Sequence, residues 1–427
     1  IYSIGGFSNV NTIVSTYKDP EKELYVQKDR DQYFSAGMNT TGISYVKPLS
    51  NKTYLKIILA YTTSRSRDHD HLVYRDSTFH VDSIVRKLGY KYIEDKLCAN
   101  LFLNTKLNSH MSFKYGLQVN RYSFNMIDSN YNQLTYKFEN QINYKGNAFL
   151  AQPYVEYKYK ISEDFVFNAG VHGQFLTLNG SSSIEPRGSI RWGFIPGQSI
   201  SLSAGMHSQM QPTYNYFYHF PFTDDLHNKS MGFTRSNQIV VSYDYRLKKF
   251  LMLKIETYYE HLYNVPVEMT PSSFSLINQG IGSKRFYPNK LVNKGTGENY
   301  GVELTVERFY VKSFFFMYTC SIYNSVYKGS DGIERSTDFN GTYAMNFLAG
   351  KTIKIGDKKS IELGIKIIYD GGRRYTPIDQ AASKVAREDI YIESLRNTLR
   401  FKPYSRLDFK IDYKINSAKL THEIGLD

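Results

Sequence analysis

Short stretches of this chain alternate strictly between apolar side chains and charged or small ones. Residues 361–367 read IELGIKI, and residues 407–414 read LDFKIDYK. Because successive side chains of a β-strand point to opposite faces, each stretch has one apolar and one charged face. A membrane-spanning barrel needs this arrangement, with lipid outside and a wet or plugged lumen inside. We therefore predict an all-β protein that forms a transmembrane up-and-down antiparallel β-barrel.

The composition agrees with a barrel. The hydrophobic content of 41% and the mean hydropathy of -0.45 resemble those of a soluble protein, but only every second strand residue of a barrel meets lipid. No run of about 18 apolar residues occurs, which excludes helical membrane spans. The 38 Tyr and 27 Phe suit the aromatic girdles at the two membrane interfaces. A Tyr-rich soluble β protein is the alternative.

The net charge of +13 is spread over strands and loops rather than gathered on one face. This favours contact with anionic lipopolysaccharide at the rim, or with an anionic ligand or partner inside, over nucleic-acid binding. Cys98 and Cys320 fall on opposite faces of remote strands, so we expect packing roles for both and no disulfide.

Counting alternating runs predicts about seventeen strands. Short turns alternate with longer polar connections, as in a barrel whose two ends face the periplasm and the exterior. The main long connections are predicted at residues 65–91, 127–147, 209–235, 264–298 and 371–403, with 179–183 the shortest. No linker interrupts the series, so residues 1–427 are predicted to form a single transmembrane domain. The absence of an initiator Met and the end within an alternating segment lead us to expect a domain incomplete at both ends.

Several phrases resemble the barrel of TonB-dependent outer-membrane receptors, of the kind common in Bacteroidetes. They are residues 184–192 (IEPRGSIRW), 207–212 (HSQMQP) with Tyr216-Phe217, 293–304 (NKGTGENYGVEL), 371–377 (GGRRYTP) and 404–408 (YSRLD). The resemblance covers most of the chain from about residue 46. It implies about 17 strands of a barrel of about 22, whose lumen holds an amino-terminal plug domain that this chain lacks.

The resemblance further implies the outer membrane of a Gram-negative bacterium and active uptake of a scarce nutrient. An iron chelate, haem, cobalamin, a glycan or a peptide would fit. The implied partners are the protein's own plug and, through that plug, the TonB–ExbB–ExbD complex. Without the plug, this part of the protein could not transport actively.

Two groups of loop residues are candidates for substrate binding. An aromatic cluster can stack on sugar rings or on a hydrophobic chelate, and paired arginines can hold a carboxylate or phosphate. Packing between loops is the alternative for both. The candidates are Tyr214, Tyr216, Phe217, Tyr218, His219, Arg373, Arg374 and Tyr375.

A third group is a charged ladder on the predicted lumen face. Hydrated charge pairs could bind a plug and be remade as it moves, whereas in an open porin the same charges would set ion selectivity. We predict that the plug faces Lys254, Glu256, Glu260, Glu303, Glu307, Lys366, Arg406, Asp408 and Lys410.

No phosphate-binding loop, zinc-ligand spacing or nucleophile elbow occurs in the sequence, so we predict no enzyme activity, no cofactor and no metal site. Residues 69–71 (HDH) could bind a transition metal, but a polar loop explains them as well. Two other functions remain open: a passive outer-membrane porin, and a structural barrel that docks surface lipoproteins.

Overall fold

The computed structural model describes residues 1–19, 29–132, 137–219, 225–279, 290–386 and 389–427. Its main element is an 18-stranded antiparallel sheet. Each strand pairs with the next along the chain, from β1 to β13 and then through β15, β16, β19 and β20. The three-residue β14 pairs only with β13. Setting β14 aside leaves the 17-strand meander that the alternation predicts.

The strands are β1 (Tyr2–Thr12), β2 (Arg30–Pro48), β3 (Thr53–Arg75), β4 (Val81–Lys106), β5 (Met111–Asn132), β6 (Lys137–Lys160), β7 (Phe165–Leu176), β8 (Ser181–Ile195), β9 (Gln198–Gln209), β10 (Thr234–Lys248), β11 (Leu251–Glu268), β12 (Leu291–Val311), β13 (Phe314–Lys328), β14 (Glu334–Ser336), β15 (Tyr343–Ile355), β16 (Lys359–Asp370), β19 (Tyr404–Asn416) and β20 (Thr421–Leu426). A separate small sheet pairs β17 (Arg374–Tyr375) with β18 (Leu399–Arg400). The helical elements are α1 (Tyr214–Phe217), α2 (Gln380–Ala386) and the 3-10 turns Val14–Thr16, Leu276–Asn278 and Glu393–Leu395.

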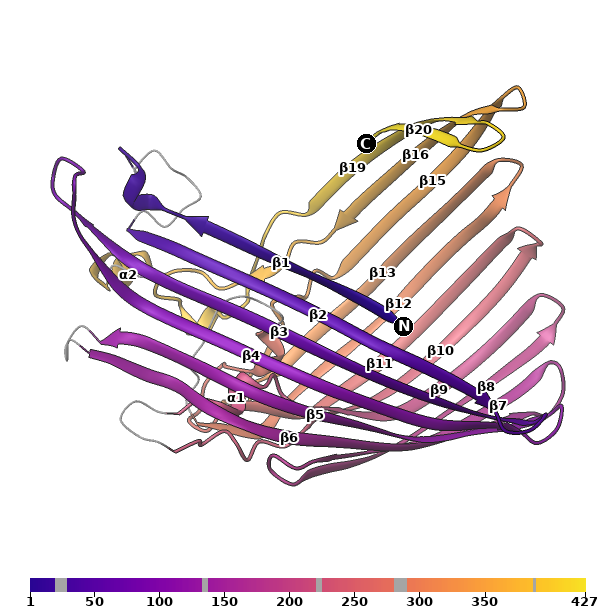
Figure 1. Cartoon of the computed structure of the whole chain (residues 1–427), viewed down its shortest axis with the longest axis horizontal. Coiled ribbons are helices and arrows are strands. Elements are labelled where there is room, and N and C mark those ends of the chain that lie inside the picture. Colours follow the sequence, from indigo (N-terminus) through magenta and orange to yellow (C-terminus); the bar gives the residue numbers. More distant parts are fainter. Residues whose placement is uncertain (20–28, 133–136, 220–224, 280–289, 387–388) are drawn as a thin grey trace.

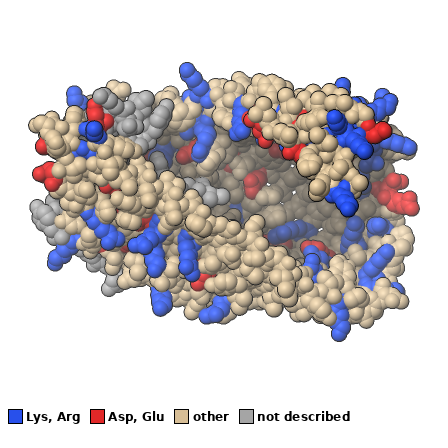
Figure 2. Space-filling model, turned by 45° about the horizontal axis from the view of Figure 1, so that its top comes forward, with Lys and Arg blue, Asp and Glu red and all other residues tan. Residues whose placement is uncertain are grey.

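The sheet curls around a hollow interior. Strands β1–β6 form a front wall, and the later strands curve behind it (Figure 1). The space-filling view shows the hollow between the walls, with acidic and basic side chains on its surface (Figure 2). Among the described residues, no backbone pairing joins β1 to β20. In the same part of the chain, no helix is long and apolar enough to cross a membrane.

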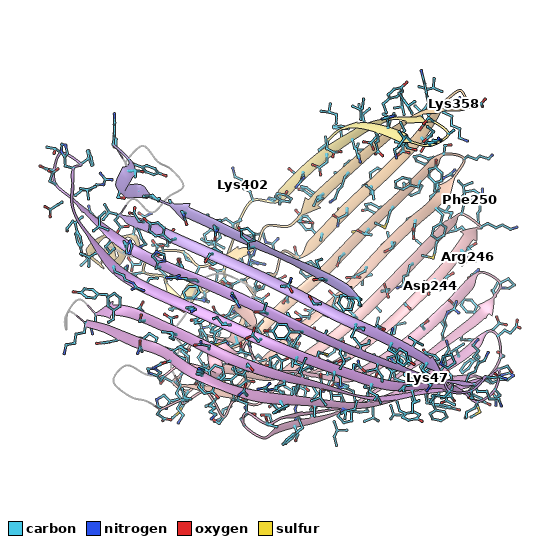
Figure 3. The ribbon with its side chains drawn as sticks, in the orientation of Figure 1. Lys47, Asp244, Arg246, Phe250, Lys358 and Lys402 are labelled. Atoms are coloured by element: carbon cyan, nitrogen blue, oxygen red, sulfur yellow. The ribbon has the colours of Figure 1, made fainter. Side chains whose placement is uncertain are left out.

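Short turns gather at one end of the sheet. Lys47, Arg246, Phe250 and Lys358 all lie there, whereas Lys402 lies toward the long connections (Figure 3). Gly197 and Gly356 occupy two of these turns with φ of 80° and 63°, a left-handed conformation that glycine adopts without strain. The predicted sorting of connections by length holds on the later strands, where long connections join β9 to β10, β11 to β12 and β16 to β19.

The predicted long loops at 65–91 and 127–147 are wrong in part. The structure continues β3 to Arg75 and begins β4 at Val81, so a paired hairpin replaces most of the first loop. Strands β5 and β6 extend likewise, to Asn132 and from Lys137. Backbone pairing between neighbours stabilises a strand whatever its side chains are, and above the lipid neither face needs to be apolar. Residues 133–136 lie outside the described part.

The two faces of the sheet differ as predicted. Val302 and Phe409 are 49% and 60% exposed, with no protein covering them on the convex side. On the concave side, Gln238 lines a cavity together with residues of β4 and β6–β9. Gln238 stands directly opposite Glu260 and donates a hydrogen bond to it, so the even-numbered polar residues of β11 face the lumen.

Candidate functional site

The connection between β9 and β10 folds back into the outer part of the lumen. Its short helix α1 places Tyr216 and Phe217 against the concave face of the front wall, where both are fully buried. The Phe217 ring stacks on Tyr144 of β6, with 3.8 Å between ring centroids and 9° between planes. Phe124 of β5 also packs on Phe217, with 5.0 Å between ring centroids and 56° between planes. This aromatic core holds the loop inside the barrel.

Hydrogen bonds fix the same loop to several strands. Thr213 donates to Glu94 of β4 over 2.6 Å. The backbone N–H of His219 donates to the Gln141 carbonyl over 3.1 Å. Near the end of the loop, the side chain of the fully buried Asn228 accepts from the backbone N–H of Leu291, at the start of β12. The loop therefore ties the front wall to the wall behind it.

Burial raises the pKa of Tyr214 and of Tyr216 to about 12. Both hydroxyls therefore stay neutral at physiological pH. The Tyr216 hydroxyl accepts a hydrogen bond from the backbone N–H of Gln211 over 3.0 Å. Tyr218 is 6% exposed and bridges to Ile142 of β6. In this arrangement Tyr216, Phe217 and Tyr218 pack inside the protein, and their contact with a substrate stays a prediction.

The second predicted group packs on a different loop, residues 329–342. The Arg373 guanidinium lies 4.5 Å from the centroid of the Phe339 ring. Arg374 donates its backbone N–H to the Asp338 carbonyl over 3.1 Å, and burial lowers the pKa of its guanidinium. Tyr375 packs on Phe401 in a tilted arrangement, with 4.4 Å between ring centroids. The Gly372 backbone approaches the Phe401 carbonyl so closely that any side chain at this position would collide with it.

The sequence alone did not reveal a polar pocket that three outer loops form together. The pocket has a volume of about 580 Å³ and lies between residues 268–274, 331–335 and 393–396. Arg335 donates two hydrogen bonds to Asp331, at 2.8 and 3.0 Å. Burial alone would raise the pKa of Asp331, but the hydrogen bonds from Arg335 and from the Ile333 backbone N–H, together with the charge of Arg335, leave this pKa below its usual value. Ser273 donates to Glu393 over 2.6 Å. The residues that line this pocket lie far apart in sequence and come together only in the folded chain.

A row of hydrogen-bonded amides begins on the concave side of the front wall and continues onto β7. Asn100 donates to Gln118 (3.2 Å), Gln118 to Gln152 (3.2 Å), Gln152 to Gln174 (3.1 Å) and Gln174 to Glu185 (2.7 Å). This amide ladder crosses β4, β5, β6, β7 and β8 and lies beside a lumen cavity of about 780 Å³. Its polar groups pair with one another, so the wall stays polar without leaving them unbonded.

The buried carboxylate of Glu185 ends the ladder. It also receives hydrogen bonds from Ser183 (2.9 Å) and Ser208, and it contacts His172 (2.9 Å) and Arg187 (2.6 Å). So many donors around one carboxylate stabilise its charged form inside the wall.

The predicted plug-facing ladder lies on the concave side of the opposite wall, and most of its members form hydrogen bonds or ion pairs. Lys254 contacts Glu256 at 2.8 Å, and Glu260 accepts from Gln238 and Asn299. Arg406 contacts Asp408 at 2.8 Å, and Lys410 contacts Asp412 at 3.1 Å. Ser321 donates to Glu303, Lys366 stands opposite Asp408, and Glu307 stands opposite Met252. Their contact with a plug stays a prediction.

His69 and His71 lie in β3 rather than in a loop. Their rings form an aromatic group with Tyr33 of β2, which stacks on His69 at 4.7 Å. Within the described ranges, no group of three or more metal-ligating side chains comes together.

Comparison with known proteins agrees with this architecture. The family model described as TonB dependent receptor-like, beta-barrel, matches residues 4–425. No curated protein sequence matches the chain.

Among solved structures, the chain resembles the ferric-catecholate import receptor Fiu from E. coli K12. The TM-score is 0.65 at 10% identity, over 94% of this chain and 61% of Fiu. The ferric yersiniabactin uptake receptor FyuA from Yersinia pestis gives 0.61 at 11% identity, over 93% of this chain and 60% of FyuA. The RagAB peptide transporter gives 0.58 at 9% identity, over 92% of this chain and 58% of that one. The chain thus spans about three fifths of the length of these proteins, and at such identities the likeness concerns the fold alone.

Proposed function

Because the chain belongs to the TonB-dependent receptor β-barrel family, we propose that it forms the barrel wall of an active importer in a Gram-negative outer membrane. The observation that carries the proposal is a meander of 17 strands with an apolar outer face and a polar inner face. A plug domain, moved by the TonB–ExbB–ExbD complex, would open a path along the inner face. The family consists of receptors and transporters, and no catalytic role is proposed.

The described parts of the connection between β9 and β10, residues 210–219 and 225–233, fold inward and support a substrate site at the outer end of the lumen. The aromatic residues of this connection fix its position, and the polar pocket of the neighbouring loops lies on the same side of the membrane. The cargo is a compound too scarce or too large for passive diffusion. The structurally similar proteins are described as importing ferric chelates or transporting copper and peptides, and each of these classes is open for this chain.

Energy dependence tests the proposal. The full-length protein is expressed in cells that lack their own copy, and accumulation is measured for ferric chelates, haem, cobalamin, oligosaccharides and peptides. We expect one class to accumulate only when TonB and the proton gradient are intact. Planar-bilayer recordings of the full-length protein should show a closed channel. Uptake that survives collapse of the gradient, together with steady conductance, would identify a passive porin instead. Stable co-purification with a lipoprotein, without any cargo, would favour a docking barrel.

The loop makes a separate prediction. Deletion of residues 210–233 should abolish cargo binding by the full-length protein, because it removes the aromatic residues of the proposed substrate site. The barrel should still show heat-modifiable migration on gels, since backbone pairing of the strands does not depend on this loop. Normal uptake by the deletion variant would exclude the loop from the site.

A further inference from the structure

The front wall carries a basic patch on its convex side, just above the apolar belt. We define the basic patch as Arg65 and Arg67 of β3, Lys91 of β4, Arg121 of β5 and Lys145 of β6, all of them exposed. The strand registers show that these side chains share the convex face with Leu59 and Leu97, which are 46% and 49% exposed. In Figure 2, Lys and Arg side chains stand out on the outside of this wall toward the long-loop end.

The registers also give the height of the patch. The row of Leu59, Ala99, Val119 and Ala151 is apolar, as are the rows closer to the short turns. The next row toward the loops contains Tyr61, Leu97 and Phe149, with Arg121 among them. Two rows further on, Arg65 and Lys145 share one row, and Arg67 and Lys91 share the one beyond it. The polar Ser123, Asn125, Asn143 and Asn147 and the apolar Ile93 and Ile127 fill further convex positions between them. The patch therefore begins where the lipid tails end.

Two features show that the positive charge is not neutralised by the protein. Arg67 and Lys91 stand directly opposite each other on neighbouring strands, an arrangement of like charges that destabilises a sheet. In the part of the chain that the structure describes, none of the five cations forms an ion pair with Asp or Glu. The one carboxylate between them on this face, Asp95, interacts with the Tyr61 hydroxyl.

On the opposite wall, cations above the belt have partners in the protein: Arg235 of β10 donates to the Ser182 carbonyl, and Lys328 of β13 lies 3.5 Å from Glu334. On the convex face of β11 and β12, the corresponding position above the belt holds His261 and Glu298, with 3.8 Å between Nδ1 and the carboxylate oxygen.

We infer that the basic patch binds the phosphate groups of an outer-leaflet glycolipid of the lipopolysaccharide type, whose acyl chains lie on the apolar rows below. Arginine donates paired hydrogen bonds to phosphate, and the neighbouring Asn and Ser side chains can add neutral hydrogen bonds. The site uses the membrane orientation of the proposed function, but it does not require transport.

Native mass spectrometry of the full-length, delipidated protein tests this site. The probes are phosphorylated lipid A, the same lipid A after removal of its phosphates, and phosphatidylcholine. The variant Arg65→Gln/Arg67→Gln/Lys91→Gln should bind phosphorylated lipid A about tenfold or more weakly than the natural protein. The control Lys47→Gln/Lys52→Gln/Lys106→Gln removes the same charge from the short-turn end and should bind normally (Lys47 is labelled in Figure 3). The variant Arg65→Lys/Arg67→Lys should keep most of the affinity.

Equal binding by the patch variant and the natural protein would overturn the inference, and so would equal binding of lipid A with and without phosphate. Heat-modifiable migration establishes that each variant is folded. Cargo uptake is measured in parallel. Loss of energy-dependent uptake in every variant and in the natural protein would refute the import function and leave the lipid site standing.

Discussion

Glu185 shows how a single charged residue can be stabilised inside the barrel wall. Its side chain is 2% exposed. One carboxylate oxygen accepts hydrogen bonds from Gln174, Ser183 and Ser208, and the other contacts His172 and Arg187. A buried carboxylate without such donors would be strongly unfavourable. The residue thus joins β7, β8 and β9 at the end of the amide ladder.

The substitution Glu185→Gln should lower the free energy of unfolding by about 1–3 kcal/mol, because an amide cannot accept from all of these donors and leaves Arg187 without its ion pair. Urea unfolding of the full-length protein in lipid vesicles measures the change. The control is Glu156→Gln, whose carboxylate is 59% exposed and lies 3.3 Å from the Lys114 ammonium. An exposed pair of this kind contributes at most about 1 kcal/mol. Equal losses in the two variants would contradict a special role for Glu185.

At the scale of the strand, the proposal of a membrane barrel depends on which face of each strand meets lipid and which face meets the lumen. Val302 and Glu303 are neighbours in β12, and the first points to the convex side with Ile322 opposite it on β13. A charged side chain on the lipid face is costly near the bilayer midplane, whereas the lumen face tolerates it.

The substitution Val302→Lys should therefore destabilise the barrel by about 2–4 kcal/mol, and Glu303→Lys by much less. Reversible unfolding in vesicles, or the temperature at which the folded band disappears from gels, gives the comparison. The two positions are adjacent, so differences in chain context are small. A larger loss for Glu303→Lys than for Val302→Lys would mean that the lumen and lipid faces are exchanged.

The same periodicity explains which parts of the fold could be predicted from sequence. Strands such as β16 and β19 alternate apolar and charged residues, so their existence and faces follow from the pattern. The end of β3 and the start of β4 lack that contrast because both of their faces meet water. The sequence pattern there therefore predicts a loop. Their pairing depends on register with neighbouring strands, which only the three-dimensional structure supplies.

The candidate site was less predictable than the fold. The aromatic density of residues 214–218 was visible in the sequence, but not that these rings face the wall of β5 and β6. The pocket between residues 268–274, 331–335 and 393–396 joins loops separated by up to about 120 residues, and no local pattern encodes that contact. The basic patch was equally hidden, because its cations lie on four strands and share one face only in the observed register.

For the whole molecule, the two walls have different shapes. Strands β2–β6 have 19 to 26 residues, whereas β7, β9, β16 and β19 have 12 or 13, and among the later strands that the structure describes only β11 and β12, with 18 and 21, reach a similar length. The long strands carry the front wall beyond the membrane, and loops packed on one another take their place on the other side. The front wall therefore provides the amide ladder inside and the basic patch outside, while the loops of the opposite wall form the polar pocket.

The two cysteines lie on opposite faces of the sheet, so their reactivity can test which face meets water and which meets lipid. Cys98 shares the concave face of β4 with Asn100, which lines the lumen cavity, and Cys320 shares the convex face of β13 with Ile322. In intact outer membranes, a small charged thiosulfonate should label the Cys320→Ser variant at Cys98, because the polar lumen face of the wall is hydrated around the proposed plug. It should not label the Cys98→Ser variant, because lipid covers Cys320. Both variants should react fully after denaturation, which serves as the control. Labelling of Cys320 with protection of Cys98 would place lipid where the lumen is proposed, and the importer proposal would fail with that result.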